Sequence, residues 1–574
     1  MNGPTLLFEF SDRYGDKSPK RFADPERIVS AETIEQVEQA FFEVEQALQQ
    51  GYYAAGFVSY EAAPAFDEAL QVHPDSEWPL VWFGIFNEPV SSGLSSHSES
   101  FQVSDWLMEG DYSQYKEGIS EIKKAIKRGE TYQVNYTTRL KADFSGNEYA
   151  FYRQLANAQK SSYSAYINTG THQLLSASPE LFFRIDDGTI TTKPMKGTAP
   201  RGRFLVEDEK RKADLLRSEK ERSENLMIVD LLRNDLGRIA LPGSVHVPEL
   251  FEVETYPTVH QMTSTIKGQL DGSFSMWEVF QALFPCGSIT GAPKVRTMEY
   301  IRELERSPRE VYCGAIGYMT PEKEAVFNVP IRTVMLNNGT AAYGTGGGVT
   351  WESTSEGEYK EIHTKAKLLT ETVPQFRLLE TMRLDDGRIP LLPYHLKRVQ
   401  NSSDYFGFKV DQALLLRKIR EIISLYRDGG HKVRMLVDQE GNPVIECTPL
   451  EEFPSALEAE LADHPVDEED PFLFHKTTHR KVYEEHQKKG KMVLLWNRIG
   501  ELTEFTIANL VVKCNGEFYT PPISCGLLSG TYRKKLVDEG VLKERVLRKE
   551  ELEEFQEIWM INSVRGWIRV HLVE

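Results

Sequence analysis

The sequence predicts an α+β protein of more than one domain, and three observations support this. The chain has 574 residues, which is longer than a typical single domain. Some segments carry apolar residues at helical spacing, whereas others alternate apolar and polar residues as a strand does. Short turn motifs join neighbouring strand-like segments into hairpins, so we expect mostly antiparallel sheets.

Composition and charge exclude several classes of function. Hydrophobic residues make up 40% of the chain and charged residues 27%, as in ordinary globular proteins. The net charge of −19 argues against a nucleic-acid surface, although a local cationic pocket can still bind an anionic substrate. Five scattered cysteines, early charges at the N-terminus and the lack of a long apolar run predict a cytoplasmic protein without a signal peptide or membrane span.

Residues 1–372 are expected to form the first part, with an N-terminal stretch (1–100) and a motif-dense core (112–370). A Ser-rich segment, 91–100, is interpreted as the loop between them. In the core, residues 115–126 have helical periodicity, and TYQVNYTTRL alternates as a strand. LLSASPELFFRI and TITTKPMKGT flank an Asp-Asp-Gly turn and predict a hairpin. Helices are expected at Glu207 to Arg238 and at Ser355 to Glu371.

A break at Val373–Pro374 predicts a second part, residues 373–574. The pattern restarts there with a hairpin around Asp386–Gly387 that leads into a helix. The acidic stretch Leu457 to Asp470 predicts an exposed connection.

Lys196 and Glu180 are candidate catalytic residues. Lys196 lies between a strand and a Gly-Thr turn, amid prolines, and a lysine held in this way can be a nucleophile if its pKa is lowered. Glu180 is on the same predicted hairpin and could protonate a leaving hydroxyl. The local sequence alone favours simpler interpretations, namely a surface lysine and an acid that caps a turn.

A glycine run at 344–348 precedes a helix that carries Glu358, Glu361 and Lys365 on one face. With Glu224 from another helix, these carboxylates would suit Mg²⁺, although a solvated helix face is the alternative. Arg332 lies in a strand-like segment where it could hold a carboxylate or form a structural ion pair. In PCGSITGAPK, Pro293 fits a first helical turn whose amides could bind a carboxylate.

These segments resemble, in order, the chorismate-utilising enzymes, which include anthranilate, isochorismate and aminodeoxychorismate synthases. The resemblance covers about Tyr112 to Lys367 and rests on YQVNYT, SASPELF, PMKGTAPRG, ENLMIVDLLRNDLGR, PCGSITGAPK, YCGAIGY, IRT and the glycine run. Anthranilate synthases usually carry Ala in place of Lys196 and His in place of Asn225. Lys and Asn at these positions resemble aminodeoxychorismate synthase component I.

The resemblance implies that Lys196 attacks C2 of chorismate as hydroxide leaves C4, with Glu180 as the general acid. Ammonia then adds at C4 and the lysine is expelled. Mg²⁺ would be held by Glu224 and Glu361, with Glu358 close by. Because the chain has no glutaminase motif, ammonia is expected from a separate glutamine amidotransferase subunit. The substrate-binding residues expected from the family are Arg332, Gly346, Gly347, Ser288, Thr198 and Lys365.

The segment from Phe376 resembles the fold-type IV pyridoxal-phosphate enzymes, which include branched-chain and D-amino-acid transaminases and aminodeoxychorismate lyase. The matching segments are LLETMRLDDGRIPLLPYHLKRV, FHKTTHRKVYE, GELTEFTIANLVV, TPPISCGLLSGTYRKKL and NSVRGW. The resemblance implies a Schiff base at Lys476 and an ion pair between Glu504 and the pyridine nitrogen. The remaining expected cofactor-binding residues are Arg398, Asn509, Thr531 and the backbone at Ser529–Gly530.

This second segment starts later and ends earlier than the family usually does. Transaminases of the family often carry Tyr where this chain has Lys481, which favours a lyase. The two parts together predict synthesis of 4-aminobenzoate, a folate precursor, from chorismate. The alternatives are an anthranilate synthase with an unrelated transaminase, and a C-terminal part that serves only as a dimerisation or docking module. A monomer and a homodimer through the C-terminal part both stay open.

Overall fold

The computed structural model describes residues 3–90, 94, 100–370, 374–488 and 491–573. The chain divides into two compact units: Met1–Pro200 with Lys212–Val373, and Arg201–Arg211 with Pro374–Glu574. Residues 201–211 therefore belong to the second unit, where the Tyr405 hydroxyl donates to the Gly202 carbonyl (2.7 Å). The break at Val373 and most of the Ser-rich segment 91–100 lie outside the described residues. None of the described helices is long and apolar enough to span a membrane.

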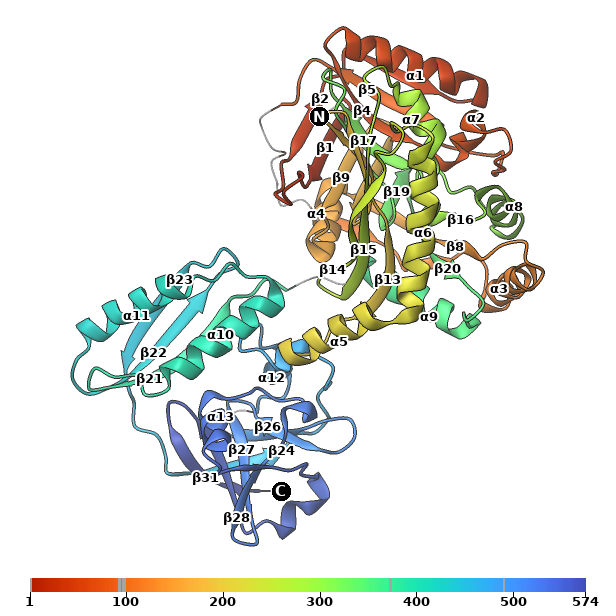
Figure 1. Cartoon of the computed structure of the whole chain (residues 1–574). Coiled ribbons are helices and arrows are strands. Elements are labelled where there is room, and N and C mark those ends of the chain that lie inside the picture. Colours follow the sequence, from red (N-terminus) through yellow and green to blue (C-terminus); the bar gives the residue numbers. More distant parts are fainter. Residues whose placement is uncertain (1–2, 91–93, 95–99, 371–373, 489–490, 574) are drawn as a thin grey trace. The chain divides into compact units, whose positions relative to one another are not determined.

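The first unit contains two ten-stranded sheets with antiparallel pairing (Figure 1). The first sheet runs in the order β16 (Gly291–Ala292), β8 (Gln133–Gly146), β20 (Thr340–Val349), β19 (Thr333–Asn337), β10 (His172–Ser178), β9 (Tyr163–Asn168), β1 (Thr5–Phe10) and β2 (Lys20–Ala23), with β6 (Phe101–Val103) and β7 (Leu107–Met108) also on β8. The second runs β13 (Met195–Pro200), β15 (Val259–Gln269), β12 (Thr189–Lys193), β11 (Leu181–Asp186), β18 (Ala325–Asn328), β17 (Ala315–Met319), β4 (Tyr53–Val58), β5 (Val81–Phe86) and β3 (Arg27–Ala31), with β14 (His246–Thr255) on β15.

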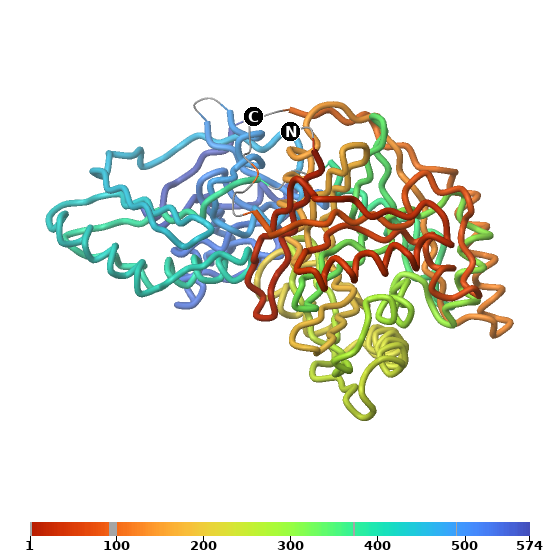
Figure 2. Tube along the Cα trace, turned by 90° about the horizontal axis from the view of Figure 1, so that it is seen from above, coloured from red at the N-terminus to blue at the C-terminus, as the bar shows by residue number. Residues whose placement is uncertain are grey.

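The two sheets share one core, because residues from both belong to the same buried apolar cluster. In it, the rings of Phe8 on β1 and Tyr318 on β17 meet edge to face at 5.4 Å. Helix α1 packs along β3, β4 and β5, and the red part of the trace in Figure 2 belongs to this N-terminal region. The helices of this unit are α1 (Ile34–Gln49), α2 (Ala63–Phe66), α3 (Tyr112–Lys127), α4 (Glu148–Gln159), α6 (Glu219–Gly237), α7 (Met276–Leu283), α8 (Lys294–Leu304) and α9 (Ser355–Ala366), and α5 (Leu205–Arg217) runs from the second unit into it.

Several predicted elements are confirmed. The helix expected at 115–126 is α3, whose N-terminus has a capping box formed by Asp111 and Gln114. The hairpin around the Asp-Asp-Gly turn is β11–β12, and Asp187 (φ 48°) and Gly188 (φ 71°) supply the positive φ that such a turn requires.

The helix predicted from Glu207 to Arg238 is instead two helices, α5 and α6. They separate at Ser218, whose side chain accepts from the Glu221 amide and caps α6. The helix expected from Ser355 ends at Ala366 and continues as a 3₁₀ turn, Lys367–Leu369. Pro293 precedes α8 as its N-cap residue and is not within its first turn.

The second unit contains a three-stranded and an eight-stranded sheet. The smaller sheet orders β21 (Leu378–Asp385), β22 (Gly430–Val437) and β23 (Pro443–Pro449), with α10 (Leu392–Phe406) and α11 (Gln412–Leu425) on it. The larger, mixed sheet orders β26 (Leu502–Phe505), β25 (Met492–Trp496), β24 (Ala456–Leu461), β31 (Gly566–Leu572), β30 (Glu557–Asn562), β27 (Ala508–Cys514), β28 (Glu517–Thr520) and β29 (Lys543–Glu544). Two short helices complete the unit, α12 (Lys481–Glu485) and α13 (Thr531–Asp538).

The acidic stretch from Leu457 was wrongly predicted as an exposed connection. Its first residues form β24, a strand between β25 and β31. Leu457, Ala459 and Leu461 alternate with glutamates and pack into the core of the larger sheet. The alternation of period two therefore outweighs the high charge of this stretch.

Candidate active sites

Lys196 lies at an irregularity in β13. The pairing of β13 with β15 shifts between Met195 and Thr198, and Gly197 has φ 104°. A Cβ at Gly197 would lie 3.2 Å from both Glu221 and Met262, so glycine suits this position. A bulge of this kind redirects a side chain. The Lys196 Nζ lies 3.3 Å from Glu224 Oε2, and each of these side chains is 18% exposed.

Asn225 holds the backbone at Lys196. Its Nδ2 donates to the Lys196 carbonyl (3.0 Å), and its Oδ1 accepts from the Ser264 hydroxyl (2.6 Å). Asn225 is buried, so both ends of its amide are satisfied inside the protein. Asn225, which the sequence marks as distinctive, thus positions the backbone from which the Lys196 side chain extends.

Glu180 is buried beside Ser288, whose hydroxyl donates to Glu180 Oε1 (2.6 Å). Burial raises the pKa of Glu180 to about 7, against the opposing effects of Ser288, the Met195 backbone and Lys196. A carboxyl group with such a pKa is partly protonated near neutral pH and can donate a proton. Ser288, expected to bind substrate, is thus engaged with the candidate acid.

The glycine run allows three charged side chains to approach one strand. A Cβ at Gly347 would lie 2.8 Å from Glu358 Oε2 and 3.4 Å from Glu361 Oε1. A Cβ at Gly348 would lie 2.5 Å from Lys196 Nζ. The lysine and both carboxylates of α9 therefore lie against adjacent residues of β20, where any larger side chain would displace them.

The acidic residues expected to bind Mg²⁺ already have protein partners. Glu224 pairs with Lys196, Glu361 pairs with Lys365 (2.7 Å), and Glu358 accepts from the Ser353 hydroxyl. Among the described residues, no group of three or more His, Cys, Asp or Glu side chains is arranged to hold a metal. Mg²⁺ usually takes only one or two carboxylates from a protein, so Glu358 and Glu361 side by side fit its chemistry.

Arg332 is a partly buried cation with no acidic partner among the described side chains. It lies between β18 and β19, not within a strand as expected, and has φ 52°. An arginine without a protein carboxylate is suited to bind the carboxylate of a ligand.

Two other residues that were expected to contact the substrate, Lys365 and Thr198, form hydrogen bonds within the protein. Lys365 Nζ donates to the Gly346 carbonyl (2.7 Å) as well as to Glu361. Thr198 is exposed, and its hydroxyl donates to Gln261 (2.9 Å). The structure thus brings Lys365 to the acidic residues but gives Thr198 a contact with Gln261 on the neighbouring strand.

Gln133 is a candidate site residue that the sequence analysis missed. It is 1% exposed, and neither atom of its amide has a hydrogen-bond partner among the described residues. A Cβ added at Gly348 would lie 2.4 Å from the Gln133 Nε2 and 2.5 Å from the Lys196 Nζ, so both groups lie beside this glycine. A buried amide without a partner is rare and suggests a ligand contact. The alternation of TYQVNYTTRL placed Gln133 on a polar face, but the first half of β8 is buried or half-buried at every residue, and the exposed residue is Tyr132, just before the strand.

Lys476 is anchored to β21 through its backbone, because the Leu379 amide donates to the Lys476 carbonyl (2.9 Å). Burial lowers the pKa of Lys476 to about 8, and the nearby Arg398 adds to this effect. A lysine with such a pKa is in part a neutral amine near neutral pH, as a Schiff-base lysine must be.

Glu504 is buried and fully hydrogen-bonded. It accepts from the Tyr483 hydroxyl (2.8 Å), the Leu528 amide (3.0 Å) and Asn509 Nδ2 (3.0 Å). Burial raises the pKa of Glu504 to about 7. Asn509, expected to contact a cofactor, also donates to the Leu528 carbonyl, so its amide holds Glu504 in place.

A cavity of about 360 Å³ lies in the second unit, and its lining includes Arg398, Ser529, Thr531, Lys397 and Lys534. Thr531 begins α13, so backbone amides and cations surround one space, a combination that suits a phosphate group. Neither Lys476 nor Glu504 belongs to this lining.

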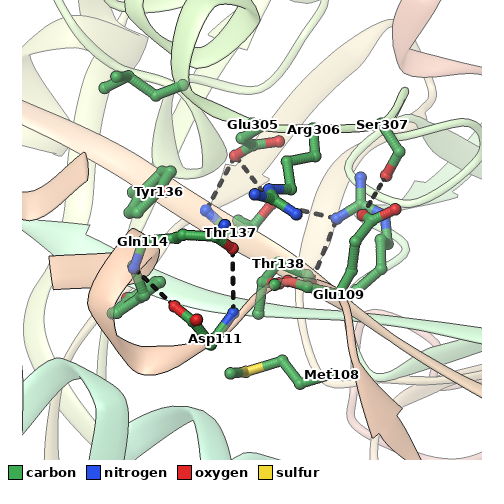
Figure 3. A pocket seen from close by; sticks show the side chains of 14 residues that line it. Met108, Glu109, Asp111, Gln114, Tyr136, Thr137, Thr138, Glu305, Arg306 and Ser307 are labelled. Carbon is green, nitrogen blue, oxygen red and sulfur yellow. Dashed lines mark hydrogen bonds between the residues drawn. The ribbon is translucent and has the colours of Figure 1, made fainter. Parts of the chain in front are cut away.

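A smaller cavity of about 60 Å³ lies in the first unit between α3, β8 and the segment after α8. Figure 3 shows its lining, in which Glu305 accepts a hydrogen bond from the Thr137 amide. None of the expected site residues lines this cavity.

Comparison with known proteins shows the family to which this fold belongs. The family described as chorismate binding enzyme matches residues 4–371, and the chain belongs to it. The family described as amino-transferase class IV matches residues 377–573, so a fold-type IV aminotransferase-like domain follows.

The individual relatives cover only parts of this chain. Aminodeoxychorismate synthase component 1 of Escherichia coli is 43% identical over 275 residues, which are 48% of this chain and 61% of that protein. Anthranilate synthase component 1 of Saccharolobus solfataricus is 33% identical over 338 residues, 55% of this chain and 80% of that protein. The crystal structure of anthranilate synthase component I from Streptococcus pneumoniae has 26% identity and a TM-score of 0.53, and the match covers 64% of this chain and 91% of that one.

Proposed function

We propose that the Lys196 site aminates chorismate to 4-amino-4-deoxychorismate, and that the second domain converts this product into 4-aminobenzoate and pyruvate. The observation that carries the proposal is the position of the Lys196 amine, which lies 3.3 Å from Glu224 and against Gly348. The charge of Lys196 also acts on Glu180, because it lowers the pKa of that carboxyl group. The similarity to proteins named aminodeoxychorismate synthase supports it. The alternative product, anthranilate, is an outcome of the test below.

In the first reaction, the Lys196 amine attacks C2 of the ring while the bond from C4 to its hydroxyl breaks. Glu180 gives its proton to the departing oxygen, which leaves as water. Ammonia then forms a bond at C4, and the lysine leaves C2 with the electron pair of its bond. Arg332, which has no acidic partner among the described side chains, would hold a substrate carboxylate.

Glu224 and Glu361 would hold Mg²⁺, with Glu358 close by, and bound Mg²⁺ would neutralise the charge of a substrate carboxylate. Gln133 lies beside Lys196 at Gly348, and its amide has two donors and one acceptor that could serve a ligand. Ammonia would come from a separate glutamine amidotransferase subunit.

In the second reaction, pyridoxal phosphate supplies an electron sink when bound. Lys476 would bind it and would then take the proton that is lost as the ring becomes aromatic and pyruvate leaves. Glu504 would keep a proton on the pyridine nitrogen. Arg398, Thr531 and the start of α13 would bind the phosphate.

The test is incubation of the full chain with chorismate, ammonia, Mg²⁺ and pyridoxal phosphate, followed by mass spectrometry of the products. We expect 4-aminobenzoate and pyruvate from the unmodified chain. The Lys476→Ala variant should accumulate 4-amino-4-deoxychorismate. Anthranilate as the product would contradict the first proposal, and unchanged pyruvate release by Lys476→Ala would contradict the second.

A further inference from the structure

The candidate acid Glu180 depends on one side-chain donor. Ser288 donates to its Oε1 at 2.6 Å. Ser288 is in the middle of a single 3₁₀ turn, Gly287–Ile289, which is too short to hold its own geometry. The position of Ser288 must therefore be fixed by other parts of the protein.

Arg309 fixes this turn. Its Nη1 donates to the Ile289 carbonyl (2.8 Å), directly after Ser288, and its Nη2 donates to the Asn135 carbonyl (2.7 Å). Asn135 joins the same junction, because its Nδ2 also donates to the Ile289 carbonyl (3.0 Å) and its amide donates to the Thr290 carbonyl (2.8 Å). The guanidinium of Arg309 and the side-chain amide of Asn135 thus connect this turn to β8.

Arg309 is itself held from two sides. Glu305 accepts from its Nε (3.0 Å) and Nη2 (2.7 Å), and Glu305 also accepts from the Thr137 amide (2.9 Å), a contact seen in Figure 3. Glu61 accepts from the Arg309 backbone amide (2.8 Å). Arg309 is 1% exposed, and an ion pair buried to this degree adds little net stability because desolvation offsets its attraction. Its directed hydrogen bonds to the two carbonyls point to a geometric role.

We propose that Arg309 is a positioning residue for the amination reaction: it holds the Gly287–Ile289 turn so that Ser288 keeps its hydrogen bond to the acid Glu180. This inference rests on the proposed function for the identity of the reaction. The geometry on which it depends, from Arg309 to the Ile289 carbonyl and from Ser288 to Glu180, lies wholly within the first unit.

The sign of the effect follows from the charge of Glu180. A donor stabilises the carboxylate and lowers the pKa of Glu180, so loss of the donor raises it. The other ionisable groups that face Glu180 are Lys196 and the Cys286 thiol, and neither changes in the variants below. Because an acid catalyst must be protonated, the rate falls as the pH rises through its pKa, and a higher pKa moves that fall to higher pH.

The experiment measures the pH profile of amination by the full chain at a constant concentration of free ammonia. In Ser288→Ala, the alkaline limb of the profile, where the rate falls, should shift to a pH about one unit higher. This is the effect of losing one hydrogen bond to a charged group. Arg309→Lys should move the limb in the same direction. The double variant should move it no further than Ser288→Ala alone, because both substitutions act through one contact.

A matched control is Arg139→Lys, which changes a buried arginine of the same region. Arg139 donates to Thr137, Thr138 and Pro308 and has no bond to the Gly287–Ile289 turn. In Arg139→Lys, the alkaline limb of the pH profile should stay at the same pH as in the unmodified chain. If Arg309→Lys does not fold, Asn135→Ala, which removes the second donor to the Ile289 carbonyl, should give a smaller shift in the same direction.

An alkaline limb that moves in Ser288→Ala but not in Arg309→Lys or Asn135→Ala would overturn the inference, as would additive shifts in the double variant. If the unmodified chain forms no aminated product, the proposed function fails, and the positioning claim is tested separately. Infrared difference spectra against Glu180→Gln then report the titration of Glu180 directly. Equal titration midpoints in the unmodified chain and Arg309→Lys would contradict the claim.

Discussion

The two candidate lysines are prepared for chemistry in different ways. Lys196 sits on a β-bulge and is paired with a carboxylate, Glu224, at 3.3 Å. Lys476 lies in a segment anchored to β21, and burial together with Arg398 lowers its pKa to about 8. The first lysine is held in position by a carboxylate, and the second is made less basic by a cationic, buried environment. The difference teaches that one chain can place two candidate nucleophilic lysines in opposite electrostatic environments.

The largest expected effect is that of Lys196→Ala. The amination rate should fall by about a thousandfold or more, as removal of a covalent nucleophile usually causes, while circular dichroism stays unchanged. Lys193→Ala is the control, because Lys193 is at the end of β12, the strand that precedes β13 in the chain, and pairs with Glu254. A rate within about twofold of the unmodified chain would remove Lys196 from the mechanism.

The second site should respond independently. Lys476→Ala should lose the visible absorbance of bound pyridoxal phosphate and the release of pyruvate, while the amination rate remains. Lys481→Ala, at an exposed lysine that pairs with Glu485, should keep both. A second domain that binds no pyridoxal phosphate in the unmodified chain would instead support a docking or dimerisation module.

A smaller effect is expected for Glu361→Gln. Loss of one carboxylate should raise the half-saturating Mg²⁺ concentration by about tenfold, because Mg²⁺ depends on few protein carboxylates. Glu356→Gln is a control on the same helix, since Glu356 is bonded to the Tyr112 hydroxyl. Identical Mg²⁺ titrations of Glu361→Gln and the unmodified chain would exclude Glu361 as a ligand.

The smallest effect concerns the stability of the second unit in acid. Burial alone would raise the pKa of Glu380, but Arg398 and His395 lower it from 4.5 to about 2. A lowered pKa in the folded state contributes stability that is present above pH 4.5 and is lost as the pH falls toward 2. In Glu380→Gln, the free energy of unfolding should therefore depend less steeply on pH in this window. Denaturant titrations at several pH values measure this slope, and equal slopes would contradict the ion-pair account.

The sequence predicted elements with strong periodicity but not those in which two signals compete. The helix around Tyr115 and the Asp-Asp-Gly hairpin were predictable because spacing and turn chemistry agree. The strand at Leu457 was missed because its glutamates suggested exposure, although its apolar residues alternate. Gln133 was missed because its burial depends on tertiary packing, including that of β8 against α8, which is distant in sequence.

The partners of the candidate residues could not be predicted from the sequence. The motifs mark Lys196 and Glu180, but the contacts of Asn225 with the Lys196 carbonyl and of Ser288 with Glu180 depend on tertiary structure. Arg309 lies outside the segments singled out for chemistry, and only its four hydrogen bonds to Glu305, Ile289 and Asn135 connect it to the site.

The most direct test of the account is the position at which nitrogen enters the ring. Full-length chain with the Lys476→Ala substitution is supplied with chorismate, Mg²⁺ and ¹⁵N-labelled ammonia, and the product is examined by nuclear magnetic resonance. We expect the label on C4, across the ring from the carboxylate. Label on C2, next to the carboxylate, would contradict it.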